Sequence, residues 1–261
     1  MNLANHVKKH FDGMLVIGDI HADYETFLRA CNHAESNNLF LMSLGDLVDR
    51  GSFPFETVSK MRDLMMAGKA GFTVGNHDDK YRRFHKGNKV SFSADAKRTL
   101  ADVGPERQEE FLRIYAEVVE AADFSALVHH FDDITLVHAA SHKSMWADKA
   151  GVLKDAARSR ALYGETNGET HPDGFPVRLY TWIEEIPMGK TVIVGHDRKP
   201  IFNVSITEPL VRTNANGGKA IFIDTGCGKG GFLTGAVITH KKHFNIDHYV
   251  EFKNEEQNDF S

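Results

Sequence analysis

The sequence predicts an α/β fold, and three observations support this prediction. Short apolar runs of three or four residues recur along the chain and end where Gly, Asp, Asn or His cluster, which is typical of strands. Segments with helical hydrophobic spacing lie between several of these runs. Further apolar runs come late in the chain. Strands alternating with helices and followed by late strands indicate stacked layers of sheet and helix.

The predicted strands share one feature, a polar cluster at or just beyond the carboxyl end. In chain order these strands cover residues 14–17, 39–42, 72–74, 134–137 and 191–194, and the late strands cover 220–223 and 236–239. In open α/β sheets, ligands bind at the carboxyl ends of the strands. We therefore expect the polar clusters after the first five strands to converge.

Three helices are predicted from hydrophobic spacing. Asp23 can cap the first, in which Tyr24, Phe27, Leu28 and Cys31 share one face. The other two cover residues 55–66 and 109–122. We find no internal repeat and no linker rich in Gly, Ser or Pro. We therefore expect a single domain over residues 1–261, with a mainly helical insert at about residues 80–125.

Composition narrows the class of protein. With 261 residues, 41% of them hydrophobic, the chain can bury a sizeable core. The formal net charge of -5 gives no global basic field that would attract nucleic acid. Two cysteines provide no disulfide framework, and no apolar stretch approaches the roughly 18 residues of a membrane span. We expect a cytoplasmic protein without a membrane or an obligate protein partner.

Six polar residues after the predicted strands form a candidate two-metal site. They are Asp19, His21, Asp46, Asn76, His138 and His196. Asp19 and His21 can face one ion if they flank a strand end, and Asp46 can bridge two ions. Mixed oxygen and nitrogen donors suit Mn²⁺, Fe or Zn²⁺. Two ions about 3.5–4 Å apart can orient a phosphate and lower the pKa of a bound water, the expected nucleophile for direct attack on phosphorus.

The motifs around these residues are more specific together than alone, because a single Gly-Asp or His at a strand end is commonly a turn or a surface group. Four motifs occur in order: Gly18-Asp19-x-His21, Gly45-Asp46-x-x-Asp49-Arg50-Gly51, Gly75-Asn76-His77 and Gly195-His196. They resemble those of the calcineurin-like metallophosphoesterases, and Asp49-Arg50-Gly51 resembles the phosphoprotein-phosphatase branch. The resemblance implies a four-layer sandwich of two mixed β-sheets flanked by helices.

The second half of the chain is similar to the phosphatase module of bacterial polynucleotide kinase-phosphatases. The similar segments are 158–169, 173–178, 223–227 and 230–234. This resemblance implies a phosphate monoesterase acting on nucleic-acid ends or 2′,3′-cyclic phosphates. A protein serine/threonine phosphatase, a dinucleoside tetraphosphate hydrolase and, more remotely, an inactive binding scaffold are alternatives. The enzymes share one metal and arginine set, so the sequence does not separate them.

The resemblance also implies ligand sets and metals. Asp19, His21 and Asp46 would hold one ion. The second ion would be held by Asp46, Asn76, His138 and His196. Two Mn²⁺ ions are the expected cofactors, with Fe, Zn or Ni as alternatives.

Catalytic roles follow from the same resemblance. Arg50 would bind the phosphate through its bidentate fork. His77, paired with Asp49, would protonate the leaving oxygen. Arg158 is the expected second phosphate-binding arginine, with Arg160 as a competing candidate. An acidic residue near the site is expected at Asp224, which a strand-end turn would also explain.

Two segments leave the substrate open. Residues 197–200 read Asp-Arg-Lys-Pro, where the family usually has Thr-Pro after Gly-His, and this places charges beside a metal ligand. Residues 80–92 form a basic and aromatic run directly after Asn76-His77. The run either borders the active-site mouth and stacks on bases, or is a solvated helix face whose aromatic side chains pack under the insert.

Overall fold

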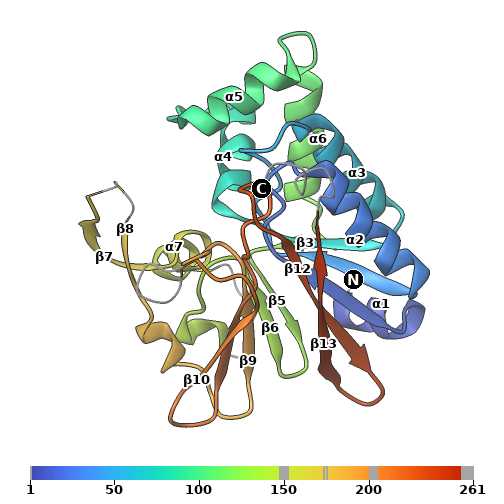
Figure 1. The fold of residues 1–261 in the computed structure, drawn as a ribbon, viewed down its shortest axis with the longest axis vertical. Coiled ribbons are helices and arrows are strands. Elements are labelled where there is room, and N and C mark those ends of the chain that lie inside the picture. Colours follow the sequence, from blue (N-terminus) through green and yellow to red (C-terminus); the bar gives the residue numbers. More distant parts are fainter. Residues whose placement is uncertain (1, 147–152, 173, 175, 200–204, 254–261) are drawn as a thin grey trace.

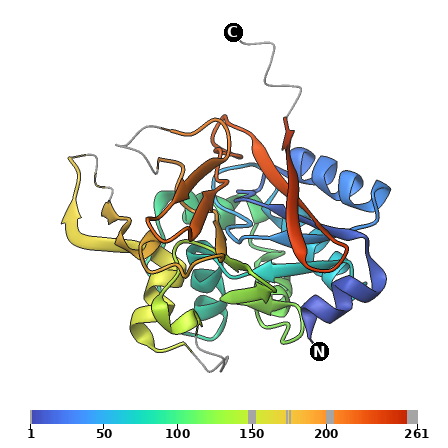
Figure 2. The same cartoon turned by 90° about the horizontal axis from the view of Figure 1, so that it is seen from below.

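Two mixed β-sheets packed face to face form the centre of the computed structural model (Figures 1 and 2). The structure describes residues 2–146, 153–172, 174, 176–199 and 205–253. In the first sheet, β1, β2, β3 and β4 run parallel, while β12 and β13 are antiparallel additions. From edge to edge, the strands of this sheet are β13 (Phe244–Phe252), β12 (Leu233–His240), β1 (Gly13–Ile17), β2 (Leu39–Ser43), β3 (Ala70–Thr73) and β4 (Ser125–Ala126).

The second sheet has three parallel strands, β6, β9 and β11, between two antiparallel edges. Its strands are β10 (Leu210–Thr213), β11 (Lys219–Phe222), β9 (Thr191–Val194), β6 (Ile134–Val137) and β5 (Val128–Phe131). A separate hairpin of β7 (Glu165–Thr170) and β8 (Pro176–Leu179) projects from this half of the molecule (Figure 1).

Helices α2, α3, α5 and α6 contribute to the hydrophobic cluster that covers the outer face of the first sheet, whereas α7 packs with the second sheet. The helices are α1 (Leu3–His10), α2 (Tyr24–Ser36), α3 (Pro54–Met66), α4 (Asn76–His85), α5 (Ala94–Val103), α6 (Gln108–Val119) and α7 (Asp155–Tyr163), with 3₁₀ turns η1 (Lys143–Trp146) and η2 (Thr181–Ile183). Among the described residues, none of the helices combines the length and apolar character that a membrane span requires.

Alternation of side chains along the central strands creates the four layers. In β1, Leu15 points to the cluster that contains Phe27 of α2, while Val16 points to the cluster that contains Ile193 of the second sheet. On the other face of the second sheet, Val192 packs with Trp182 of η2. The prediction of two mixed sheets flanked by helices is confirmed.

The predicted strands 134–137 and 191–194 have the observed bounds, and the other predicted elements differ at their ends. The predicted strand 72–74 begins two residues earlier, and the helix predicted to reach residue 122 ends at Val119. The sequence did not indicate α1, α7, β4, β5, β10, β13 or the β7–β8 hairpin. Helices α4 and α5 fall largely within the stretch of about residues 80–125 that was expected to be helical, although their bounds were not predicted. Strand β7 is almost entirely exposed and β13 largely so, and neither carries a regular apolar pattern.

Candidate active site

The six predicted metal ligands lie together at the carboxyl ends of strands from both sheets. Asp19 and His21 follow β1, Asp46 follows β2, Asn76 follows β3, His138 follows β6, and His196 follows β9. Two groups of potential ligands share Asp46, and within each group the ligand atoms lie within 4.8 Å of one another. The groups are Asp19, His21 and Asp46, and Asp46, His138 and His196. Asp46 thus occupies the place of a bridging carboxylate.

Several residues of these loops have a positive φ, a backbone conformation that residues other than glycine seldom adopt. Eight non-glycine residues of the described chain have positive φ, and six of them belong to the site loops. The six are His21, Ala22, Asp46, Asp49, Arg50 and His196. Such strain persists only where the surrounding structure over-determines it, and it concentrates at functional sites.

Close approach between loops explains why glycine precedes several ligands. A Cβ atom on Gly75 would lie 2.3 Å from Oδ1 of Asp46, and one on Gly195 would lie 2.3 Å from Oδ1 of Asp19. The same carboxylates accept backbone hydrogen bonds, since the N–H of His77 donates to Asp46 (3.1 Å) and that of His196 to Asp19 (2.8 Å). The Gly-Asn and Gly-His motifs therefore let one ligand loop pack directly on another.

Hydrogen bonds to backbone carbonyls orient two of the ligand histidines. The Nδ1 atom of His21 lies 3.0 Å from the carbonyl of Val48, and that of His138 lies 2.7 Å from the carbonyl of Leu44. An Nδ1–H donor in each ring leaves Nε2 with a lone pair for a metal. The Nε2 atom of His138 in turn lies 3.0 Å from Nδ1 of His196.

Several buried polar atoms in this cluster have no hydrogen-bond partner, and a bound metal cation would be a suitable partner for them. Oδ2 of Asp19, Nε2 of His21 and Nε2 of His196 have no hydrogen-bond partner among the described residues. Burial and the neighbouring Asp46 carboxylate raise the pKa of Asp19. Burial lowers the pKa of His21 to about 3 and that of His196 well below its usual value, so both rings offer lone pairs. These residues fit two divalent ions.

His77 lies beside this cluster on α4 and is paired with Asp49. Its Nδ1 lies 2.5 Å from Oδ2 of Asp49, and its Nε2 lies 3.8 Å from Oδ2 of Asp46. Burial opposes a positive charge on the ring, but the carboxylates of Asp46 and Asp49 outweigh it and raise the pKa of His77. Asp49 also accepts hydrogen bonds from the hydroxyls of Tyr81 (2.5 Å) and Thr99 (2.8 Å). A protonated His77 can donate a proton beside the metal ligands.

Asp78 is a residue that sequence reasoning missed. It is fully buried and accepts the backbone N–H groups of Gly75 (2.7 Å), Asp46 (2.8 Å) and Leu47 (3.1 Å), with a further hydrogen bond from the Tyr115 hydroxyl. Burial and the nearby Asp46 raise the pKa of Asp78 to about 6. This carboxyl group ties the loops after β2 and β3 together. Its only sequence signal is its place directly after Asn76-His77.

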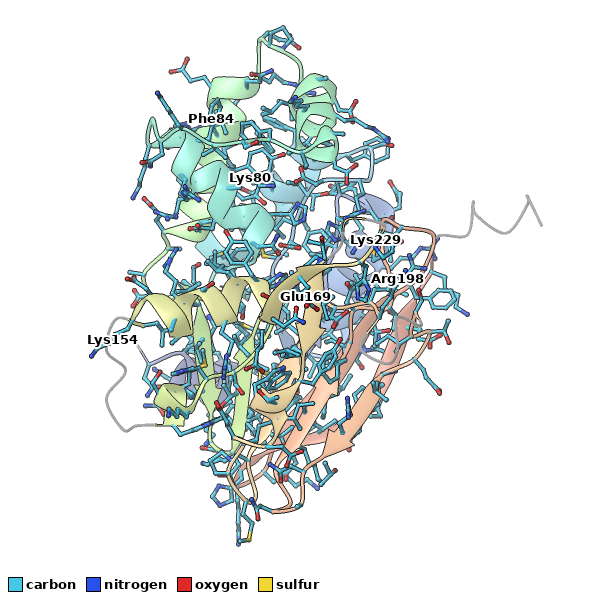
Figure 3. The ribbon with its side chains drawn as sticks, turned by 90° about the vertical axis from the view of Figure 1, so that its left-hand side faces the viewer. Lys80, Phe84, Lys154, Glu169, Arg198 and Lys229 are labelled. Carbon is cyan, nitrogen blue, oxygen red and sulfur yellow. The ribbon has the colours of Figure 1, made fainter. Side chains whose placement is uncertain are left out.

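A cleft of about 1510 Å³ opens over the metal ligands. Its lining includes His21, Asp46, Asn76, His77 and His196. Among the described residues, six cationic side chains line it, against two carboxylates, those of Asp46 and Asp197. The cations are Arg50, Arg178, Arg198, Lys199, Arg212 and Lys229. Figure 3 shows Arg198 and Lys229 close together, and Nη1 of Arg198 donates to the carbonyl of Lys229 (3.2 Å). The cleft is cationic although the chain as a whole is acidic.

The other predicted catalytic residues lie outside the cleft lining. Arg158 donates to Oδ1 of Asp79 (2.8 Å) and lines a separate pocket of about 270 Å³. Arg160 is paired with Glu165 and Glu185. The cleft arginine on that side of the molecule is instead Arg178, which sequence reasoning quoted only as part of a motif.

Asp224 lies behind the metal ligands. It is buried, and it accepts the N–H of Gly226 (3.0 Å) and lies 3.5 Å from Nζ of Lys229. Burial and the charge of Asp19 raise its pKa. Asp224 is therefore close to Asp19 of the first ligand group and is not part of the cleft lining.

The basic and aromatic run 80–92 lies in the helical part of the molecule, and most of its residues are exposed. Tyr81 is buried and packs on Phe92, which also contacts Phe84. Arg82 is paired with Asp79, and Lys86 with Glu120. In Figure 3, Lys80 and Phe84 lie well away from Arg198 and Lys229 of the cleft.

Sequence comparisons with known proteins also indicate a phosphoesterase. The family model of calcineurin-like phosphoesterases matches residues 14–222. Two relatives are bis(5′-nucleosyl)-tetraphosphatases PrpE [asymmetrical]. The one from Halalkalibacterium halodurans is 28% identical over 84% of this chain and 87% of its own length, and the one from Anoxybacillus flavithermus is 29% identical over the same shares. The sequence predicted a similarity to polynucleotide kinase-phosphatase modules. The relatives found are instead tetraphosphatases.

A solved structure supports the fold. The protein serine/threonine phosphatase from Saccharomyces cerevisiae superposes with a TM-score of 0.54 at 15% identity, and the match covers 97% of this chain and 87% of that one. At this identity the likeness shows the fold alone. With the family match spanning most of the sequence, the chain belongs to the calcineurin-like phosphoesterase family and is a phosphoester hydrolase that uses divalent metal ions.

Proposed function

We propose that the chain hydrolyses bis(5′-nucleosyl)-tetraphosphates asymmetrically, to a nucleoside triphosphate and a nucleoside monophosphate. The observation that carries this proposal is the cationic cleft, in which six Arg and Lys side chains accompany the metal ligands. A single phosphate monoester does not need that many cations, whereas a chain of four phosphates presents several negative charges along its length. The names of the tetraphosphatase relatives support the same substrate.

The metal ligands and His77 have separate roles in this proposal. Two divalent ions, Mn²⁺ first among the candidates, would bind the two groups that share Asp46, where they would orient phosphate oxygens and lower the pKa of a water molecule. Arg50, which lines the cleft, would bind the phosphate through its guanidinium fork. His77 would hold a proton at Nε2 for the leaving oxygen.

The overall reaction adds a hydroxyl group to a terminal phosphorus and breaks its bond to the bridging oxygen. The bridging oxygen leaves on the nucleoside triphosphate, and the second proton of the water goes to solvent. Because a triphosphate is a good leaving group, it needs less help from His77 than an alkoxide does.

The earlier expectation of nucleic-acid ends loses its structural support. It rested on the second-half resemblance and on the run 80–92 reaching the substrate, but in that run Tyr81 packs into the helices and Arg82 and Lys86 pair with neighbouring carboxylates. Phosphorylated oligonucleotides and phosphopeptides therefore become the competitors in the test.

The test is a substrate panel with the enzyme first stripped by a chelator and then reloaded with Mn²⁺. It compares diadenosine tetraphosphate with 3′- and 5′-phosphorylated oligonucleotides, 2′,3′-cyclic nucleotides and a phosphopeptide. We expect the highest kcat/KM for the tetraphosphate, with ATP and AMP as products by anion-exchange chromatography. A higher kcat/KM for any competitor, or ADP as the only product, would refute the proposal. Equal turnover by verified metal-free protein would refute the metal dependence.

A further inference from the structure

A pair of arginines lies on the cleft wall that is built from β8, β10 and the loop after β9. We propose that Arg178 and Arg212 form an oligophosphate subsite, which binds the phosphate groups of the substrate that are not cleaved. This inference deepens the proposed function and rests on it. Neither arginine is among the site residues that the sequence predicted, although Arg178 lies in the segment 173–178 that carries part of the resemblance.

Two contacts hold the guanidinium group of Arg178 in place, and the same side chain also lines the cleft. Its Nη1 donates to the carbonyl of Tyr163 (3.0 Å), and its Nε lies 3.8 Å from Oδ2 of Asp197. These contacts use only part of the five N–H donors of a guanidinium group. The side chain is 21% exposed and lines the cleft. An anion in the cleft can therefore receive hydrogen bonds from a guanidinium that is already oriented.

Asp197 connects this arginine to the metal centre. It directly follows the ligand His196, and its side chain is only 9% exposed. Its Oδ2 accepts the hydroxyl of Tyr180 (2.6 Å), and its Oδ1 accepts the N–H of Lys199 (3.0 Å). Burial and the charge of Asp197 raise the pKa of Tyr180 above its usual value, so the phenol stays a hydrogen-bond donor. Asp197 is a positioning residue that places Arg178 next to the site of cleavage.

Arg212 completes the pair from the edge strand β10. Its guanidinium carbon lies 5.8 Å from the centroid of the Tyr180 ring, and its side chain lines the cleft. The same tyrosine thus contacts Asp197 through its hydroxyl and Arg212 through its ring. The Tyr180–Asp197 pair orders both arginines at once.

The placement of the cations explains why the ligand is an oligophosphate and not a single phosphate. Arg50 approaches from the helical side, where it lies 3.5 Å from Asp95 of α5, whereas Arg178 and Arg212 come from the strands β8 and β10 (Figure 1). A lone phosphate bound by the metals and Arg50 would leave Arg178 with only the carboxylate of Asp197 and Arg212 without a phosphate partner. A longer phosphate chain can reach both sides, and arginine forks suit phosphate oxygens.

The test measures how two products inhibit aryl phosphate hydrolysis, with free Mn²⁺ in constant excess. ATP probes the subsite because it carries phosphates beyond the first, and AMP is the matched ligand without them. In Arg178→Gln we expect the Ki for ATP to rise about 10–100-fold, the usual range for losing a charge-assisted hydrogen bond, and the Ki for AMP to rise less than about threefold. Arg212→Gln should give a smaller change in the same direction.

Two control variants and one fallback variant accompany this test. Arg62→Gln removes an exposed arginine that pairs with Asp63 on α3, and it should leave both Ki values unchanged. Arg178→Lys keeps the charge without the fork and should lie between wild type and Arg178→Gln. If Arg178→Gln does not fold, by its thermal unfolding midpoint, Arg212→Gln decides, because its strand is largely exposed.

An unchanged ratio of the two Ki values in the folded variants would overturn the subsite, even if the enzyme cleaves diadenosine tetraphosphate. A changed ratio in an enzyme that does not cleave the tetraphosphate would instead refute the proposed function and leave the oligophosphate subsite in place.

Discussion

Two neighbouring stretches were candidates for contact with the substrate, and the structure uses them in different ways. The ligand loops up to His77 were predicted to form the site, whereas the sequence left the role of the run 80–92 open. The ligand loops up to His77 lie at the ends of strands, with strained backbone and tight contacts between loops. In the run 80–92, Tyr81 packs into the helices, Phe84 is 37% exposed, and two of the cations pair with carboxylates. Position at the end of a buried strand predicts where a side chain points, whereas a basic and aromatic composition does not.

The difference has a physical cause. The carboxyl ends of parallel strands must meet at one edge of a sheet, so residues far apart in sequence are brought together by backbone pairing. A basic run on a helix has no such constraint, and its apolar members are drawn into the nearest core while its charges find nearby partners. Tyr81 illustrates this, because its ring is buried while its hydroxyl donates to Asp49, the partner of His77.

The largest effect is expected from the bridging carboxylate. Asp46→Asn removes the charge shared by both ligand groups, so metal content should fall and activity should drop by more than the about 10–100-fold typical of residues that only support a ligand. Metal content is measured by plasma mass spectrometry and activity with an aryl phosphate. Asp133→Asn, the same change at a surface residue paired with Lys190, should alter neither. Full metal content in Asp46→Asn would contradict the bridging position.

His77→Ala is expected to rank second. The metals should stay bound, while kcat for an alkyl phosphate should fall by about 10²–10⁴, the usual contribution of general acid catalysis. The loss should be smaller for nitrophenyl phosphate, whose leaving group needs no proton. His85→Ala on the same helix is the matched control and should leave kcat unchanged. Equal losses for both substrates would exclude His77 as the acid.

Tyr81→Phe tests the hydrogen bond that joins the run 80–92 to Asp49. The change leaves the ring in the core but removes its hydrogen bond to Asp49, so His77 loses part of its support. We expect a several-fold fall in kcat and a loss of stability of about 1–2 kcal/mol by chemical denaturation. Tyr249→Phe on β13 is the control. A fall in stability with no fall in kcat would make Tyr81 a packing residue only.

The smallest effect is expected from the basic run itself. Replacing Arg82, Arg83 and Lys86 together with Ala should leave KM for diadenosine tetraphosphate and for a phosphorylated oligonucleotide within about twofold of wild type, since the run lies outside the cleft lining. The salt dependence of both KM values should also be unchanged. A KM that rises for the oligonucleotide alone would return the run to the substrate surface and favour nucleic-acid ends.

The sequence by itself determined the α/β class and the identity of the residues that converge at the metal centre. It could do so because each ligand follows a short apolar run with strand character, and because glycine stands where two loops touch, as at Gly75 and Gly195. Both features are local, so they can be read without knowing the distant parts of the chain.

Only the tertiary structure decided which arginines line the cleft. Arg158, Arg160 and Arg178 have the same side chain, but Arg158 is taken by Asp79, Arg160 by Glu165 and Glu185, and Arg178 alone of the three lines the cleft. Strand β8 and the buried Asp197 bring Arg178 there, although Asp197 lies 19 positions further along the chain. The role of a flexible cation depends on which carboxylate the fold places beside it, and that pairing is not encoded in local sequence.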